Sequence, residues 1–240
     1  MLGHQRLKRD RRRLLALTGL TPKEFATLHQ AFCVAYATVY PEDKTADGRA
    51  RKRQSGGGRK GQLRTTEQKL LFILVYQKAY PLQALLGEVF GLSQSRANRW
   101  IQRLLPILKQ ALDELEVLPS REPGHFAEQE RGHQEAAELI IDGTDRRRQR
   151  PKNPVKQASH YSGKHKAHSD KNVVVVNAKT KRVGYLSQTY AGKIHDKKIA
   201  DSEPICYPPA TILYKDTGFQ GYEPNVRQTH QPKKSHPKAH

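Results

Sequence analysis

ELIIDGT at residues 138–144 and TILYKDTG at residues 211–218 are two short apolar runs that each lead into an aspartate. Runs of this length that stop at an acid with glycine close behind are typical of buried strands whose ends face a cleft. A single case would be ordinary turn chemistry. Two cases, Asp142 and Asp216, predict paired carboxylates at neighbouring strand ends, an arrangement that holds divalent metal ions. The alternative is two unrelated turns.

The sequence between these runs has the pattern of a hairpin and one helix. We expect strands at residues 171–176 and 183–189, a turn between them, a loop at 190–193 and a short helix at 194–201. Strand, hairpin, helix and strand is the opening order of a ribonuclease H-like fold, in which the first and fourth strands lie side by side. That order would bring Asp142 and Asp216 together although they are far apart in the sequence.

The N-terminal part of the chain predicts one long helix and a linker. Thr21, Pro22 and Glu24 form a helix start with a capping box, and this helix should end before Pro41. Residues 1–13 are polar and basic and are expected to be frayed. The Gly-rich basic stretch at residues 47–64 either follows the phosphates of a bound polyanion or is a plain loop.

Residues 65–110 carry a dense helical pattern. Helices are expected at 67–80, at 82–90 and from Ser93 onward, with Gly91 in the turn before the last one. This is the helix-turn-helix pattern, whose second helix enters the major groove of DNA. The residues expected to meet DNA from that helix are Gln94, Ser95, Arg96, Arg99 and Arg103, whereas Trp100 and Leu104 are expected in the core. A structural three-helix bundle is the alternative.

The charge changes sign between the two patterned regions, because acids outnumber bases at residues 111–136 and Pro119, Pro123 and Gly124 interrupt the chain. We interpret this stretch as an acidic linker. The predicted organisation is a helical segment at 1–46, the basic linker at 47–64, a helix-turn-helix domain at 65–110, the acidic linker at 111–136 and a nuclease domain at 137–240. The fold class is α/β (α+β): an all-α helix-turn-helix domain followed by an incomplete ribonuclease H-like domain.

The composition points to a nucleic acid partner. Lysine and arginine number 43 against 23 acids, and the formal net charge is +20. Such an excess bears on partners rather than on fold, and nucleic acid is the expected polyanion. No run approaches the ~20 apolar residues of a membrane span, and Cys33 and Cys206 alone make neither a disulfide framework nor a zinc site. We expect no membrane partner and a soluble, cytoplasmic protein.

A basic loop follows the first aspartate run and contains Pro151 and Pro154. Its position beside Asp142 predicts a rim that binds phosphates next to the carboxylate. The residues expected to contact DNA from this rim are Arg146, Arg147, Arg148, Arg150, Lys152 and Lys164.

The chemistry that suits these residues is the cutting or joining of a phosphodiester. In-line attack builds charge on the attacking and leaving oxygens, and two metal ions stabilise both. Mg²⁺ prefers oxygen ligands and keeps several waters, so a few carboxylates are enough. His195 and Asp196 either support this site or contact the cut strand; the alternative is a helix cap beside a solvated histidine.

In combination, these motifs resemble the transposases of the insertion sequence 5 family, which belong to the DDE endonuclease superfamily and are related to the Harbinger elements. The resemblance spans about residues 65 to 234 and depends on the helix-turn-helix and on four further stretches, DGT at 142–144, YSGKHK at 161–166, GKIHDKK at 192–198 and DTGFQGY at 216–222. It implies a ribonuclease H-like nuclease, Mg²⁺ or Mn²⁺, binding to terminal inverted repeats and target DNA, and a homo-oligomer on DNA. Asp142 matches the first catalytic and metal-binding acid of the family, and Asp216 matches the second.

The chain departs from the family after Asp216. The family has a third acid, a glutamate on a later helix, whereas here Glu223 is the sole acid after Asp216 and precedes Pro224. We do not assign Glu223 as the third ligand, and we expect the fold's last strand and closing helices to be missing. Lys233 and Lys234 can be encoded by an A-rich run, so the chain is interpreted as the upstream frame of a frameshifted transposase or as a truncated relic.

The sequence therefore predicts a DDE transposase with an N-terminal DNA-binding half and an incomplete nuclease half. Without a third acid it should bind DNA but cleave poorly. The alternatives are a non-catalytic DNA-binding regulator of transposition and a basic protein associated with RNA or the ribosome.

Overall fold

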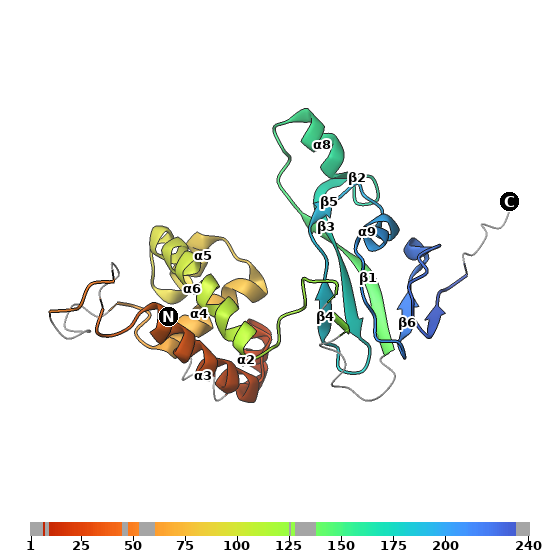
Figure 1. The fold of residues 1–240 in the computed structure, drawn as a ribbon. Helices are drawn as coiled ribbons and strands as arrows, with labels where there is room; N and C mark the ends of the chain where they lie inside the picture. Colours follow the sequence, from red (N-terminus) through yellow and green to blue (C-terminus); the bar gives the residue numbers. More distant parts are fainter. Residues whose placement is uncertain are drawn as a thin grey trace. The chain divides into compact units, whose positions relative to one another are not determined.

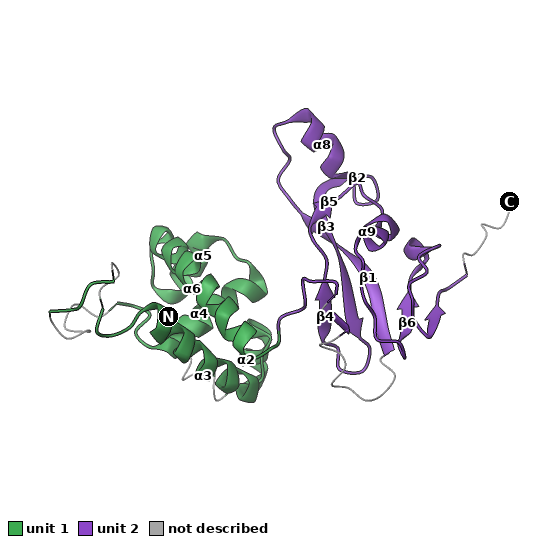
Figure 2. Ribbon diagram, in the orientation of Figure 1, with its two compact units in different colours: residues 1–117 green, residues 118–240 purple. Residues whose placement is uncertain are grey.

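The computed structural model describes residues 7, 10–44, 48–52, 61–124, 126–127 and 138–233. Contacts divide the chain into two compact units, residues 1–117 and residues 118–240, which Figure 2 shows in different colours. The core of the basic stretch at 47–64, most of the second half of the acidic stretch at 111–136 and the last seven residues lie outside the described ranges. Each unit is considered by itself.

The first unit is built from helices. They are α2 (Arg11–Thr18), α3 (Pro22–Val39), α4 (Thr66–Ala79), α5 (Gln83–Phe90) and α6 (Gln94–Glu114), all labelled in Figure 1. The four helices expected from sequence are confirmed. The expectation of a frayed start is wrong from residue 10 onward, because Asp10 caps α2 through the Arg13 N–H and Leu14 is fully buried.

Local hydrogen bonds explain where these helices begin and end. The predicted capping box is present in α3, where the Thr21 N–H donates to Glu24 Oε2 over 2.7 Å and Thr21 Oγ1 accepts from the Glu24 N–H. Gly91 closes α5 with φ +67°, a left-handed conformation that glycine adopts without steric cost. Ser93 stands at the cap position of α6, but its side chain makes no capping hydrogen bond.

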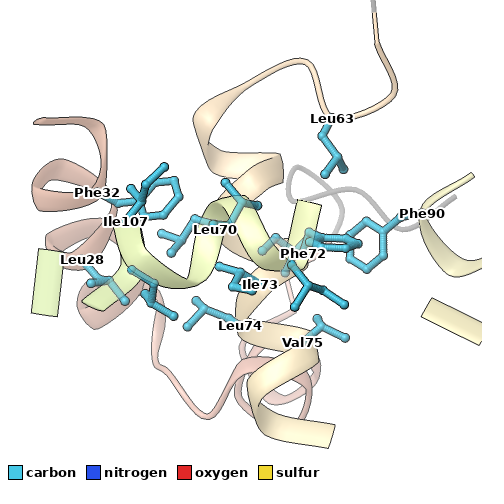
Figure 3. Packing of buried hydrophobic residues seen from close by; sticks show 14 of the residues in the cluster. Leu28, Phe32, Leu63, Leu70, Phe72, Ile73, Leu74, Val75, Phe90 and Ile107 are labelled. Carbon is cyan, nitrogen blue, oxygen red and sulfur yellow. The ribbon is translucent and has the colours of Figure 1, made fainter. Parts of the chain in front are cut away.

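One hydrophobic core joins the helices of the first unit, and Figure 3 shows part of it. Phe32 of α3 and Leu70 of α4 are fully buried in it, and the Phe72 ring meets the Phe90 ring edge-on with centroids 5.1 Å apart. Leu104 of α6 is fully buried, as expected, whereas Trp100 is only partly buried against the core. The buried side of α6 is therefore fixed, and its arginines are left on the exposed side.

The second unit is a mixed sheet with the order β2-β3-β1-β6-β7, in which β4 and β5 also pair with β3. The strands are β1 (Glu138–Arg147), β2 (Tyr161–Ser162), β3 (Ala167–Asn177), β4 (Val183–Leu186), β5 (Tyr190–Ala191), β6 (Ile212–Lys215) and β7 (Gln228–His230). β3 runs antiparallel to β1, and β6 runs parallel to β1. The predicted pairing of the first and fourth strands of the pattern is confirmed, and so is the α+β fold class.

Three expectations about the strands are corrected. β1 does not end at Asp142 but continues to Arg147, because β3 begins four residues earlier than expected and pairs with it as far as Arg147↔Ser169. The expected loop at 190–193 contains β5, which pairs with Lys171 and Asp170 of β3. A further strand, β7, pairs in parallel with β6, so the expectation that the fold's last strand is missing is wrong.

The sheet is accompanied by α8 (Pro154–His160), α9 (Asp196–Ser202) and the short 3-10 turn η1 (Thr217–Phe219). α9 packs through Ile199 and Ala200 on the core that contains Leu139, Ile141 and Leu213. Its C-terminal end is fixed by buried Glu203, which accepts hydrogen bonds from the Tyr185 hydroxyl, the Gln188 N–H and the Tyr190 hydroxyl. Burial, followed by these contacts with Glu203, raises the pKa of Tyr185.

The second unit takes in part of the stretch expected to be a linker. The backbone of Ser120 forms an isolated β-bridge with Tyr185. Phe126 is fully buried against the Tyr185 and Tyr207 rings. The boundary between the two compact units therefore falls after Val117, whereas the nuclease domain was expected to start at residue 137. None of the helices in the described part of the chain has the length and apolar character needed to cross a bilayer.

Candidate active site

Asp142 and Asp216 occupy equivalent positions on neighbouring parallel strands. The register of β1 and β6 ends at the pair Ile141↔Lys215. Asp142 directly follows Ile141, and Asp216 directly follows Lys215. Strand alternation places them on the same face as Ile140 and Tyr214, which are 38% and 37% exposed. Both aspartates are exposed themselves. The topology thus brings the two predicted acids to adjacent strands and to one face of the sheet.

Backbone groups orient both carboxylates. Asp142 Oδ1 accepts from the Gly143 N–H over 2.7 Å, and Asp216 Oδ1 accepts from the Gly218 N–H over 2.8 Å. A groove of about 560 Å³ opens beside them, and its further lining comes from Tyr214, His230 and neighbouring residues of β1, β6 and β7. The Tyr214 and His230 rings stack in it with centroids 5.1 Å apart.

The carboxylate oxygens of Asp142 and Asp216 are donors of the kind that suits a hard divalent cation. Two carboxylates on adjacent strands supply oxygen ligands, and Mg²⁺ binds through one or two carboxylates while it keeps several waters. Within the described residues, no group of three or more His, Cys, Asp or Glu side chains is placed to hold a metal ion. Among these residues, Asp142 and Asp216 therefore offer a divalent cation a pair of carboxylates and not a cluster of three.

Glu223 is engaged elsewhere. Its Oε1 lies 2.9 Å from the Nζ of Lys215, whose side chain is almost fully buried and also donates to the Tyr222 carbonyl. Lys215 alternates with the two aspartates and points to the opposite face of β6. From the sequence we did not assign Glu223 as a third ligand. Its ion pair with Lys215 gives the structural reason, because it holds the carboxylate away from Asp142 and Asp216.

Asp196 lies on the opposite face of β1 from Asp142. It is the first residue of α9, and a Cβ atom added to Gly143 would meet Asp196 Cγ and Oδ1 at 2.5 Å. A Cβ added to Gly218 would lie 3.7 Å from Asp196 Oδ2 and 3.0 Å from Asp216 Oδ1. Asp196 is thus close to the Asp216 loop, while His195 is exposed and makes no capping hydrogen bond through its side chain.

The buried cation that holds Asp196 was missed by sequence reasoning. Lys171 of β3 is 8% exposed, its Nζ lies 3.1 Å from Asp196 Oδ1 and 3.9 Å from Asp145 Oδ2, and it donates to the Ile194 carbonyl over 3.0 Å. Asp145 also accepts from Ser169 Oγ over 2.8 Å. The available signal was a lysine two residues before the apolar run that starts at Val173, because a lysine is almost never fully buried without a partner.

Gly143 offers a direct test of the contact with Asp196. Gly143→Ala is expected to lower the free energy of unfolding by about 2 kcal/mol, because the new methyl group would overlap a carboxylate that Lys171 holds in place. Urea unfolding followed by circular dichroism measures the effect. Gly163→Ala is the matched control, since its Cβ would meet nothing within 4 Å. Equal stability of the two variants would contradict the close approach.

The predicted phosphate rim is partly occupied by internal contacts. Arg146 donates to Asn172 Oδ1, Arg148 forms a 2.8 Å ion pair with Asp170, and Arg150 donates to Gln157. Arg147, Lys152 and Lys164 are exposed without such a contact in the described part of the chain. The arginine pairs fix the loop in shape, and the remaining cations keep the surface basic.

The residues predicted on α6 lie together on its exposed side. Gln94, Ser95, Arg96, Arg99 and Arg103 are all exposed. Arg96, Arg99 and Arg103 border a groove of about 670 Å³, whereas Gln94 and Ser95 do not line it. Trp100 also lines this groove, so its expected role as a core residue alone is incomplete. Arg64, from the segment before α4, lines it as well and was not predicted.

Comparison with known proteins agrees with both halves of the chain. Residues 61–114 match the helix-turn-helix of DDE superfamily endonuclease, and residues 141–239 match the DDE superfamily endonuclease family. No curated protein and no solved structure matches the chain. The first match covers α4 to α6, so the helix-turn-helix interpretation is confirmed over a purely structural bundle, and the second contains Asp142 and Asp216. The chain therefore belongs to the DDE superfamily of endonucleases.

Proposed function

We propose that the protein is a DNA transposase that binds the terminal inverted repeats of a mobile element and cuts and joins DNA strands with a divalent metal ion. Asp142 and Asp216 are the proposed catalytic residues and metal ligands. The observation that supports this most directly is the parallel pairing of β1 with β6, which places the two acids at equivalent positions on one exposed face. The match of residues 141–239 to the DDE endonucleases supports the same reaction class.

Each part of the chain has a task in this proposal. Asp142 and Asp216 would hold Mg²⁺ or Mn²⁺, which supplies charge stabilisation for the attacking and leaving oxygens of an in-line displacement. Arg147, Lys152 and Lys164 would hold the DNA backbone beside the acids, because exposed cations bind phosphates without regard to sequence. Lys171 and Asp196 would fix the first turn of α9 next to the Asp216 loop.

The finer assignment is also a proposal. We infer that, within the superfamily, the chain is a transposase of the insertion sequence 5 family, that its second unit is ribonuclease H-like, and that it acts on DNA as a homo-oligomer in the bacterial nucleoid. The strand order β4-β3-β1-β6-β7, antiparallel on one side of β1 and parallel on the other, supports the ribonuclease H-like assignment.

The test is strand cleavage of a labelled duplex that carries the inverted repeat flanking the element. The full chain is incubated with the duplex in Mg²⁺, in Mn²⁺ and in chelator, and binding is measured on the same samples. Nicks at the repeat end that require metal are the expected result. Binding without nicks in either metal would contradict the nuclease assignment.

A second candidate is a non-catalytic DNA-binding regulator of transposition. The observation that favours it is the pairing of Glu223 with Lys215, while the described residues contain no group of three or more acids, histidines or cysteines placed to hold a metal ion. This candidate predicts repeat binding that competes with an active transposase and no strand cleavage. The same assay therefore separates the two functions.

A further inference from the structure

The first unit contains a groove between α6 and the segment that precedes α4. Its volume is about 670 Å³, and it is lined by Arg64 on one side and by Arg96, Arg99 and Arg103 with Trp100 on the other. The segment is firmly placed. Leu63 is buried, the Arg64 N–H donates to Gln68 Oε1 over 2.8 Å, and the Arg64 carbonyl accepts from Lys69 Nζ over 3.3 Å. The groove is therefore formed before any ligand enters.

The charge in this groove has one sign. Within the described residues, no acid lines the groove and none of its four arginines forms a salt bridge. Behind the groove, buried Lys69 adds a fifth cation, with its Nζ 5.7 Å from the Trp100 ring centre. Burial lowers the pKa of Lys69. Like charges held together without counter-charges repel one another, so this arrangement favours an anionic ligand.

The spacing of the arginines favours a chain of phosphates over a single small anion. Arg96, Arg99 and Arg103 follow one side of α6, and seven residues of helix rise by about 10 Å. One strand of a DNA duplex carries a phosphate about every 3.4 Å along the axis. The row is therefore long enough to meet more than one phosphate of a strand, and Arg64 adds a cation to the groove from outside α6.

We propose that this groove clamps the phosphodiester backbone of duplex DNA, with Arg64 as a contact that accompanies the three arginines of α6. This deepens the proposed function and rests on it. In this assignment Arg96 and Arg99 contact phosphates and not base edges. Gln94 and Ser95, which are exposed at the start of α6 but do not line the groove, are left to contact base edges.

The test compares Arg64→Gln in the full chain with Arg12→Gln, an exposed arginine of α2 outside the groove. Binding of two duplexes, one with the inverted repeat and one scrambled, is measured between 50 and 200 mM salt. Arg64→Gln should weaken binding to both duplexes by the same factor. It should also reduce the slope of log K against log salt concentration by about 0.9, as expected for one lost phosphate contact. Arg12→Gln should leave the slope at the wild-type value.

Trp100 provides a second readout, because it is the single tryptophan of the sequence and lines the groove. Its fluorescence should change when either duplex is added to the wild-type chain, and the change should shrink in an Arg64→Gln, Arg103→Gln double variant.

Several outcomes would overturn the clamp. If the wild type binds duplex but Arg64→Gln behaves like Arg12→Gln, or if Trp100 fluorescence is unchanged by bound DNA, the groove does not hold the backbone. A loss confined to the repeat duplex would make Arg64 a base contact and would also overturn the clamp. If the wild type binds neither duplex, the proposed function fails together with the clamp.

Discussion

Asp142→Asn is expected to lower metal-dependent strand cleavage by about 10²–10³-fold while duplex binding stays at the wild-type level. The asparagine keeps the size of the side chain and an oxygen that can accept from the Gly143 N–H, but it removes the negative charge that would hold the cation. A metal ion supplies several kcal/mol of charge stabilisation to the transition state, and each 1.36 kcal/mol is a factor of ten in rate.

Asp201→Asn is the control for this variant. Asp201 is an exposed acid that pairs with Lys197 on the surface of α9, so its replacement changes the net charge by the same amount away from the Asp142 edge. The assay is cleavage of the labelled repeat duplex in Mg²⁺ and Mn²⁺. If Asp142→Asn and Asp201→Asn cleave at equal rates, Asp142 is not a catalytic residue, even if the chain remains a nuclease.

The sequence was sufficient for the parts of this fold that depend on local signals. The capping box of Thr21 and Glu24 and the left-handed turn at Gly91 each follow from one residue type in one backbone conformation. The pairing of the two aspartate-bearing strands also followed, because the order of elements between them leaves few arrangements. This strand pairing places Asp142 and Asp216 at equivalent positions on neighbouring strands.

The parts that the sequence did not reveal depend on pairing between distant residues. β1 extends past Asp142 because β3 offers partners as far as Ser169, and no local signal in the Arg146 region announces this. The internal contacts of Arg146, Arg148 and Arg150 likewise require residues that are 7 to 43 positions away. The sequence of a basic loop therefore does not reveal which of its cations already have partners within the protein.

The Lys171 cluster shows the same limit for charges. A lysine, two aspartates and a histidine spread over residues 145–196 look like unrelated surface residues in the sequence. The structure places Asp145 opposite Lys171 in the register of β1 and β3. Asp196, at the start of α9, contacts the same lysine. His165 Nε2 completes the cluster at 3.4 Å from Asp145 Oδ2.

Lys171→Met is expected to lower the free energy of unfolding by about 3 kcal/mol, at the low end of the range for breaking a buried ion pair. Asp196 Oδ1 is buried and accepts no hydrogen bond within the described residues, so the ammonium 3.1 Å away is its compensation. The low end applies because the two aspartate side chains are 23% and 19% exposed.

Urea unfolding followed by circular dichroism measures this loss, and Trp100 fluorescence reports the first unit, whose midpoint should not move. Lys164→Met, at an exposed position, should change the stability by less than about 0.5 kcal/mol. Adding Asp196→Asn to Lys171→Met should recover part of the loss, because the double variant no longer buries an uncompensated charge. A Lys171→Met protein as stable as Lys164→Met would show that the buried cation does not hold Asp196, and with it the first turn of α9, against β1.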